Sequence, residues 1–169
     1  MPHSAAPSPA LSPTPSLAVP GLSLAMRLTV LIGAPQELGQ FDGMRKRIIP
    51  ITGGTVDGPL LHGTVLPGGA DWQSIRADGT ADILARYTLE ASDGTLISVV
   101  NPGYRHGPAP VLARIAAGEE VDPALYYFRT APRFEVAGDS PHGWLGRTIF
   151  IGTAARHRDH VRLEIFALD

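Results

Sequence analysis

The segment GGADW, residues 68–72, places a carboxylate directly after two glycines and directly before a tryptophan. Glycine permits positive φ angles and close backbone approach, so Asp71 could be directed into an apolar cavity. Burial there would raise the pKa of its carboxyl, and Asp71 could then act as a general acid or base. The alternative is that Asp71 caps a turn by accepting backbone N–H bonds. Trp72 is expected in the core or in a cavity wall, where it could contact a ligand.

Two further side chains could take part in the same chemistry. Arg47, in RKRIIP, shares a strand face with isoleucines, and an internal ion pair with Asp71 would satisfy both charges. That pair could be purely structural, or it could polarise a ligand carbonyl. Tyr87 alternates with Ile83 and Leu89, which predicts that it faces inward. Its hydroxyl could donate to a carbonyl or enolate oxygen, or it could simply bond a local partner. We predict Asp71, Arg47 and Tyr87 as the catalytic set.

Other residues are candidates for ligand contact. Arg129, in YYFRTAP, could clamp an anion or form a surface ion pair. His62 follows two leucines on an expected strand and could line a cavity, although exposure is favoured. Tyr104 lies in NPGYRHGPAP, which is expected to be a loop that could act as a lid. Together with Trp72, these residues are the predicted ligand-binding set.

Several classes of protein are disfavoured by what the sequence lacks. There is no cysteine, the six histidines are scattered, and there is no HExxH, GxxxxGK[ST] or GxSxG motif. We therefore expect no metal site and no cofactor. The net charge of −2 does not suggest nucleic-acid binding, which normally needs a basic patch. No apolar run reaches membrane-helix length and the N-terminus is a poor secretory signal, so we expect a cytoplasmic protein without membrane attachment.

The elements that would position these residues are short strands. Residues 1–20 are rich in Pro, Ser and Ala and predict a disordered tail, followed by one domain over residues 21–169. ADILARYTLEA alternates most clearly, and the ASDG turn joins it to TLISVVN as a hairpin. One short helix is expected over Pro110 to Val121. Strands are expected at 22–33, 44–53, 60–68, 81–91, 95–101, 124–136, 143–152 and 160–168. This pattern predicts an all-β antiparallel barrel, with a sandwich as the alternative.

The motifs RIIPITGG, GxVLPGGADW, ARYxL and YYFRTAPRFE, with a DG turn on each side of ARYxL, resemble the family called domain of unknown function 3237. The resemblance covers Arg45 to about Ile151. It implies a lipocalin-like β-barrel. It also implies that a few relatives work without a cofactor in natural-product or aromatic pathways. There they would add water or an alcohol across an activated double bond, or close a ring.

The leading hypothesis is a cofactor-free enzyme that binds a small apolar or aromatic organic ligand. Its reaction would be a hydration, an intramolecular addition or a cyclisation of an enone or aromatic compound, which makes it a lyase, hydratase or cyclase. The first alternative is a ligand-binding or carrier barrel without turnover. The second is a structural barrel whose interior is filled by its own side chains. A homodimer is expected from base rates alone.

Overall fold

The structure, a computed structural model, describes residues 17–169. The predicted tail, residues 1–20, lies outside the described residues except for its last four. Over the described part the chain forms eleven strands and one α-helix, α1 (Ala109–Ala116). The strands are β1 (Leu22–Ile32), β2 (Gln36–Phe41), β3 (Met44–Asp57), β4 (Gly63–Val65), β5 (Gly69–Ile75), β6 (Ala81–Ala91), β7 (Leu96–His106), β8 (Tyr127–Thr130), β9 (Arg133–Glu135), β10 (Phe150–Arg156) and β11 (His160–Leu168).

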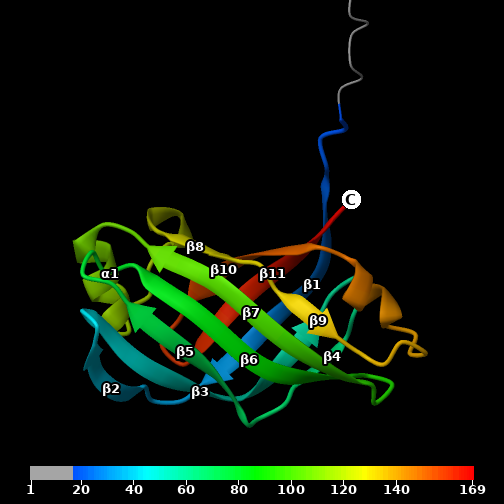
Figure 1. Ribbon diagram of the computed structural model, residues 1–169, viewed down its shortest axis with the longest axis horizontal. Coiled ribbons are helices and arrows are strands. Elements are labelled where there is room, and N and C mark those ends of the chain that lie inside the picture. The colour runs from blue at the N-terminus through cyan, green and yellow to red at the C-terminus, as the bar shows by residue number, and fades with distance from the viewer. Residues whose placement is uncertain (1–16) are drawn as a thin grey trace, which may run out of the picture.

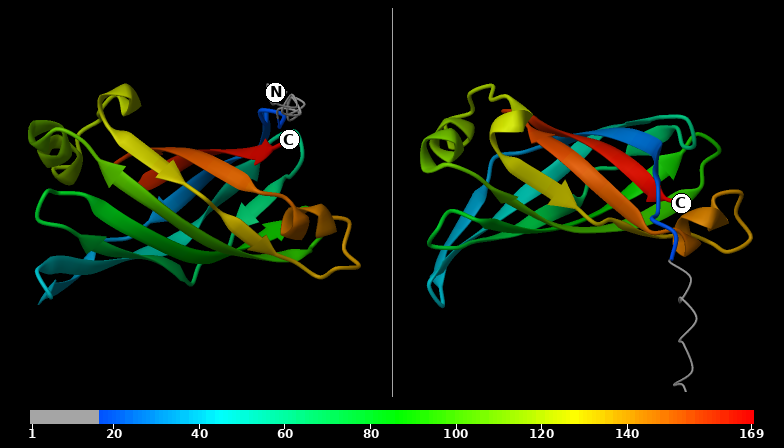
Figure 2. Two further views of the ribbon diagram at one scale, coloured as in Figure 1. Left: turned by 45° about the horizontal axis from the view of Figure 1, so that its top comes forward. Right: turned by 90° about the horizontal axis from the view of Figure 1, so that it is seen from above.

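Eight of these strands close into a barrel (Figures 1 and 2). The order of antiparallel pairing is β1–β3–β5–β6–β7–β8–β10–β11, and β11 pairs again with β1. Neighbours around the barrel follow the order of the chain, as in the up-and-down barrels of lipocalins. β2 extends β3 at one end, β4 bridges β3 and β6, and β9 pairs with β7. The predicted all-β, lipocalin-like barrel is confirmed.

Strand β6 shows why the sequence folds in this way. Its odd-numbered positions, including Ile83 and Leu89, are buried, and on the outer face Leu84 and Arg86 are exposed. Successive side chains of a strand point to opposite faces, so one face fills the barrel and the other meets solvent. The same inward parity continues through the other barrel strands, and their buried aliphatic and aromatic side chains form one core.

The glycines of ITGG allow the long strand β3 to bend and to pair with different strands along its length. Gly53 and Gly54 have φ angles of 141° and 145°, and the pairing of β1 with β3 shifts register beside them. A Cβ atom at Gly54 would overlap the carbonyl oxygen of Thr29. These glycines form a bulge, which bends β3 so that the strand contacts β5 at one end and β4 at the other.

Helix α1 covers one end of the barrel (Figure 1). It places Ile115 in the core, and Gly118, with a φ angle of 77°, follows its end. The helix therefore stops before Val121, because the backbone turns left-handed at the glycine. Within residues 17–169, no helix combines the length and apolar character that crossing a bilayer requires.

Three expectations about local structure were wrong. No strand was expected over residues 69–75, but β5 begins at Gly69 and carries Asp71 within it. NPGYRH is not a loop, because β7 continues through it to His106. Residues 143–147 form a 3-10 turn rather than the start of a strand. The first two differences matter for function, because both segments contribute side chains to the interior of the barrel.

Candidate active site

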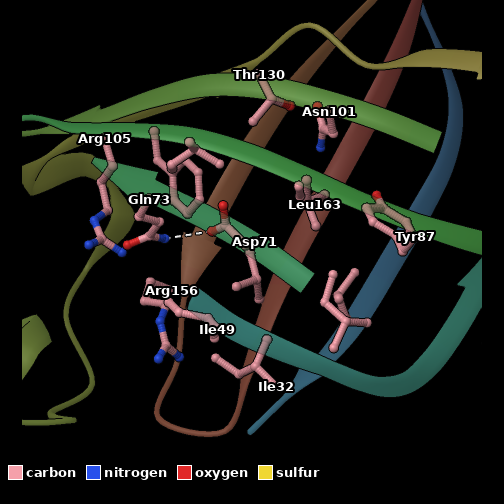
Figure 3. A pocket seen from close by; sticks show the side chains of 16 residues that line it. Ile32, Ile49, Asp71, Gln73, Tyr87, Asn101, Arg105, Thr130, Arg156 and Leu163 are labelled. Atoms are coloured by element: carbon pink, nitrogen blue, oxygen red, sulfur yellow. Dashed lines mark hydrogen bonds between the residues drawn. The ribbon is translucent and has the colours of Figure 1, made fainter. Parts of the chain in front are cut away.

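A cavity lies inside the barrel toward the end covered by α1. It encloses about 40 Å³. On that measure one water needs roughly 15 Å³, so the cavity can hold a few waters or a group of a few atoms. Most of its wall is aliphatic. The polar lining residues are Asp71, Gln73, Tyr87, Asn101, Arg105, Thr130 and Arg156 (Figure 3).

Strand register explains why these polar side chains meet. Asp71 on β5 pairs with Ile49 on β3 and with Ala85 on β6, and Ala85 pairs in turn with Asn101 on β7. All four residues therefore lie in one row around the barrel wall. Because alanine contributes a single methyl group, space remains between the carboxylate of Asp71 and the amide of Asn101. The cavity occupies part of that space.

Asp71 is held through one of its two carboxylate oxygens. The Gln73 amide donates from Nε2 to Oδ2 of Asp71 at 2.5 Å, and Arg47 donates from Nε to Oε1 of Gln73 at 2.9 Å. Although Asp71 as a whole retains some solvent exposure, its Oδ1 atom is buried and has no hydrogen-bond partner within the described chain. This arrangement fixes the orientation of the carboxylate and leaves one oxygen free to face a ligand.

Burial dominates the electrostatics of Asp71. It raises the pKa of the carboxyl, and this exceeds the opposing effects of the Gln73 hydrogen bond, the positive charge of Arg105, the backbone of Leu84 and the positive charge of Arg47. A protonated fraction therefore persists at a higher pH than for an ordinary aspartate. A carboxyl that can hold or release a proton, with one free oxygen in a cavity, has the properties of a general acid or base.

Two arginines, Arg105 and Arg156, line the same cavity as Asp71. Arg105 is only 7% exposed, and its Nε has no hydrogen-bond partner within residues 17–169. Burial and the nearby charges of Arg47 and Arg156 lower the pKa of Arg105 to about 10, so it stays protonated at neutral pH. Arg156, at the end of β10, is half-buried, and its Nη1 donates to backbone carbonyls of the following turn. The cavity therefore carries an excess of positive charge around one carboxylate.

The inner part of the cavity is closed by neutral polar groups. Tyr87 is buried, and its burial raises the pKa of the phenol despite a hydrogen bond with the Asn101 side chain. Tyr87 therefore remains a hydrogen-bond donor at neutral pH. The Oδ1 of Asn101 and the Oγ1 of Thr130 are buried without partners in the described chain. Unpaired buried polar atoms are costly, and several of them around one cavity indicate a site that a ligand or water completes.

The structure brings together all three residues of the predicted catalytic set. Asp71 and Tyr87 line the cavity, and Arg47 lies on the inward face of β3. The expected direct pair between Arg47 and Asp71 is not formed, because Gln73 lies between them and bonds to both. Their positions are as expected, while their catalytic roles remain predictions.

The four predicted ligand-contact residues do not line the cavity. Trp72 and Tyr104 are 43% and 51% exposed, and the His62 side chain is 63% exposed and pairs with Asp57. Arg129 is also exposed, over the ring of Tyr127. The reason is strand parity. Once Asp71 faces inward its neighbour Trp72 must face outward, and the same rule turns Tyr104 and Arg129 to the outside.

Five cavity residues were missed by the sequence analysis: Gln73, Asn101, Arg105, Thr130 and Arg156. The signal for two of them was present. Continuing the parity of Ile97 and Val99 along β7 places Asn101 and Arg105 inward. The proline and glycine of NPGYRH led instead to a loop. Thr130 lies on the same face of β8 as the buried Phe128, so strand parity also pointed to it.

Among residues 17–169, no group of three or more metal-ligating side chains is present. His157 and His160 stack with their ring centroids 4.3 Å apart, but each bonds a different carboxylate, Glu120 and Asp159 respectively.

A closed up-and-down barrel with a polar cavity at its covered end defines a lipocalin-like β-barrel. The family described as protein of unknown function (DUF3237) matches residues 20–168, and the chain belongs to this family. A UPF0311 protein of Rhodopseudomonas palustris is 44% identical over 138 residues, which span 82% of this chain and 90% of that protein.

Two solved structures are similar to the chain. A conserved protein of unknown function from Rhodopseudomonas palustris has a TM-score of 0.86 at 38% identity, covering 90% of this chain and all of that one. A structure described as an enzyme from Penicillium herquei has a TM-score of 0.67 at 24% identity. It covers 94% of this chain and all of that one. This second likeness is one of fold alone.

Proposed function

We propose that this protein is a cofactor-free enzyme that carries out acid–base chemistry on a small unsaturated carbonyl or aromatic compound in the barrel cavity. The observation that supports this proposal most strongly is the state of Asp71. One of its oxygens is anchored by Gln73, the other is buried and unpartnered within residues 17–169, and burial raises the pKa of the carboxyl. A purely structural carboxylate would be expected to have both oxygens satisfied.

The reaction would be an addition of an O–H group across an activated double bond. Asp71 removes the proton from water or from a hydroxyl group of the substrate. The freed oxygen bonds the β-carbon of the enone, and the π electrons move onto the carbonyl oxygen as an enolate. Asp71 then returns the proton to the α-carbon. No proton or electron is left over, so the cycle requires neither a cofactor nor an oxidant. With an internal hydroxyl, the same sequence closes a ring.

The arginines and Tyr87 would supply the stabilisation that this reaction needs. Negative charge moves from Asp71 or the nucleophile to the carbonyl oxygen, and fixed positive groups are most effective where charge develops in a water-poor site. Arg105 and Arg156 both line the cavity and interact electrostatically with Asp71. Tyr87 keeps its proton and would donate from the inner end. Arg47 acts through Gln73 as a positioning residue for the carboxylate.

The enzyme description of the Penicillium herquei structure is consistent with this proposal, but at 24% identity it supports the fold rather than any particular reaction. The filled-barrel alternative is disfavoured by the cavity and by the buried polar atoms around it that lack partners in the described chain. The carrier alternative predicts the same binding site without turnover.

The test is an NMR assay in D2O with hydroxy-enones, chalcone-like phenols and cyclic diketones. Wild type is compared with Asp71→Asn and with Asp139→Asn, a matched change at an exposed loop position. We expect product signals with deuterium at the α-carbon for wild type and Asp139→Asn, and their loss in Asp71→Asn. Line broadening without product in all three proteins would establish a carrier and overturn the enzyme proposal.

A further inference from the structure

We propose that the ligand of this cavity is a small organic monoanion whose carboxylate is bound by Arg105 and Arg156, with its carbon skeleton directed inward to Asp71. The inference deepens the proposed function and rests on it for the inner end of the ligand. Arg105 and Arg156 bind the carboxylate and act on the enolate only through their charge, while Tyr87 donates directly to the enolate oxygen. The binding of the carboxylate is a separate claim, which is tested by affinity and not by turnover.

The charges around the cavity do not balance. Burial lowers the pKa of Arg105 and of Arg156, the positive charge of Arg47 lowers both further, and the charge of Arg156 also lowers that of Arg105. The one carboxylate among the cavity-lining residues is Asp71. Glu37 approaches Arg47 to 3.9 Å but lies at the surface. Among the described residues, neither Arg105 nor Arg156 forms an ion pair with a carboxylate. Buried charges are normally paired, so an anion is the missing partner.

Arg105 offers the donor geometry that a carboxylate needs. Its Nε is buried and has no partner in the described chain, and its side chain lies along the cavity wall, over the ring of Phe128 (Figure 3). A guanidinium presents Nε and one Nη in a plane at the spacing of two carboxylate oxygens, which gives a bidentate contact. Arg156 is held in place because its Nη1 donates to carbonyl groups of the β10–β11 turn.

The lining of the cavity favours a carboxylate over a phosphate. Apart from the polar set, the wall consists largely of aliphatic side chains such as Ile49, Ile51 and Leu163, which suit a hydrocarbon skeleton. The volume of about 40 Å³ accommodates a slender group. A phosphate dianion would place up to two negative charges close to Asp71, whereas a carboxylate places one. A short unsaturated monocarboxylate satisfies the charge, the apolar wall and the volume of about 40 Å³.

Four probes test the inference in two pairs matched in shape. Crotonate is compared with crotonamide, and butyrate with butyramide, by NMR titration at pH 7 in low salt. We expect each carboxylate to bind at least tenfold more tightly than its amide. Arg105→Gln and Arg156→Gln should remove most of this preference. Arg133→Gln, at an exposed outer position, should keep it. Folding of each variant is checked by circular dichroism.

The inference would be overturned if wild type bound each carboxylate and its amide equally well. It would also be overturned if wild type bound none of the four probes. Because Arg105 is buried, Arg105→Gln could fail to fold, and the half-buried Arg156→Gln variant then decides the outcome. The Asp71→Asn variant separates this inference from the proposed function. It should bind crotonate at least as tightly as wild type, because a negative charge is removed from the site. Turnover by Asp71→Asn would refute the proposed function and leave the carboxylate site intact.

Discussion

Replacing Asp71 by asparagine should make the folded protein more stable at neutral pH. The pKa of Asp71 is raised in the folded state by burial, so the folded protein binds a proton more readily at this site than the unfolded chain does. The free energy of unfolding therefore falls as pH rises from the pKa of Asp71 in the unfolded chain, about 3.9, to its pKa in the folded protein. Above the folded-state pKa, the full cost of burying the ionised carboxylate remains. The attraction of the arginines is already included in this balance. Asparagine keeps the shape and removes the cost.

The size of the gain follows from the unpartnered oxygen. An unsatisfied buried polar atom costs about 1–3 kcal/mol, and more when it is charged. The amide group of the substituted side chain would still lack full pairing, so we expect a net gain of about 1–2 kcal/mol at pH 7. For a chain of this size that corresponds to roughly 2–4 °C in Tm per kcal/mol. The assay is urea unfolding of wild type and Asp71→Asn at several pH values.

The pH dependence distinguishes this explanation from a general effect of the substitution. The advantage of Asp71→Asn should be small near pH 4 and should grow to a plateau at neutral pH. The exposed control, Asp139→Asn, should show no such trend. If Asp71→Asn were less stable than wild type at pH 7, the arginines would outweigh burial. Asp71 would then be a structural counter-ion, and the argument for a proton-active carboxyl would fail.

Three further changes test other parts of the site. Gln73→Leu removes the hydrogen bond that lowers the pKa of Asp71, so the acid limb of the rate–pH profile should move to higher pH. An unchanged limb would show that Gln73 does not control the pKa of Asp71. Tyr87→Phe leaves its Asn101 partner unpaired and should cost about 1–3 kcal/mol in urea unfolding, whereas the exposed Tyr104→Phe should cost almost nothing. Gly103→Ala would drive its Cβ atom into the backbone of the neighbouring strand, and a loss of about 1–3 kcal/mol is expected. Stability within error of wild type would show that β7 and β8 can separate there.

The architecture could be predicted from the sequence because the strand patterns are clear. The alternation in residues 81–91 indicates a strand with one buried face. The short spacing between expected strands indicates that neighbours along the chain pair in an antiparallel sheet. The closed order of the strands then follows the chain. The bulge at Gly53 and Gly54 was also predictable, because paired glycines inside a strand pattern allow positive φ angles.

The site was predicted only where strand parity was assigned correctly. Tyr87 was placed inward because the strand around it was recognised. Trp72 was misplaced because no strand was assigned to its segment, so strand parity was not applied to it. Arg105 was missed for the same reason, since Pro102 and Gly103 interrupt the apolar pattern of β7 while leaving its pairing intact.

Arg156 could not be assigned from sequence. It lies at the very end of β10, and its approach to Asp71 depends on closure of the barrel through strands far apart in the chain. The excess of positive charge around a single carboxylate is therefore a property of the fold.

The most direct test of the account is the titration of the Asp71 carboxyl carbon by NMR in 13C-labelled protein, assigned by comparison with Asp71→Asn. The account predicts a midpoint clearly above the ordinary value of about 3.9 for aspartate, because burial outweighs the nearby arginines. A midpoint at or below that value would contradict it, since Asp71 would then be a permanently ionised partner of the arginines and not a group that exchanges protons with a substrate.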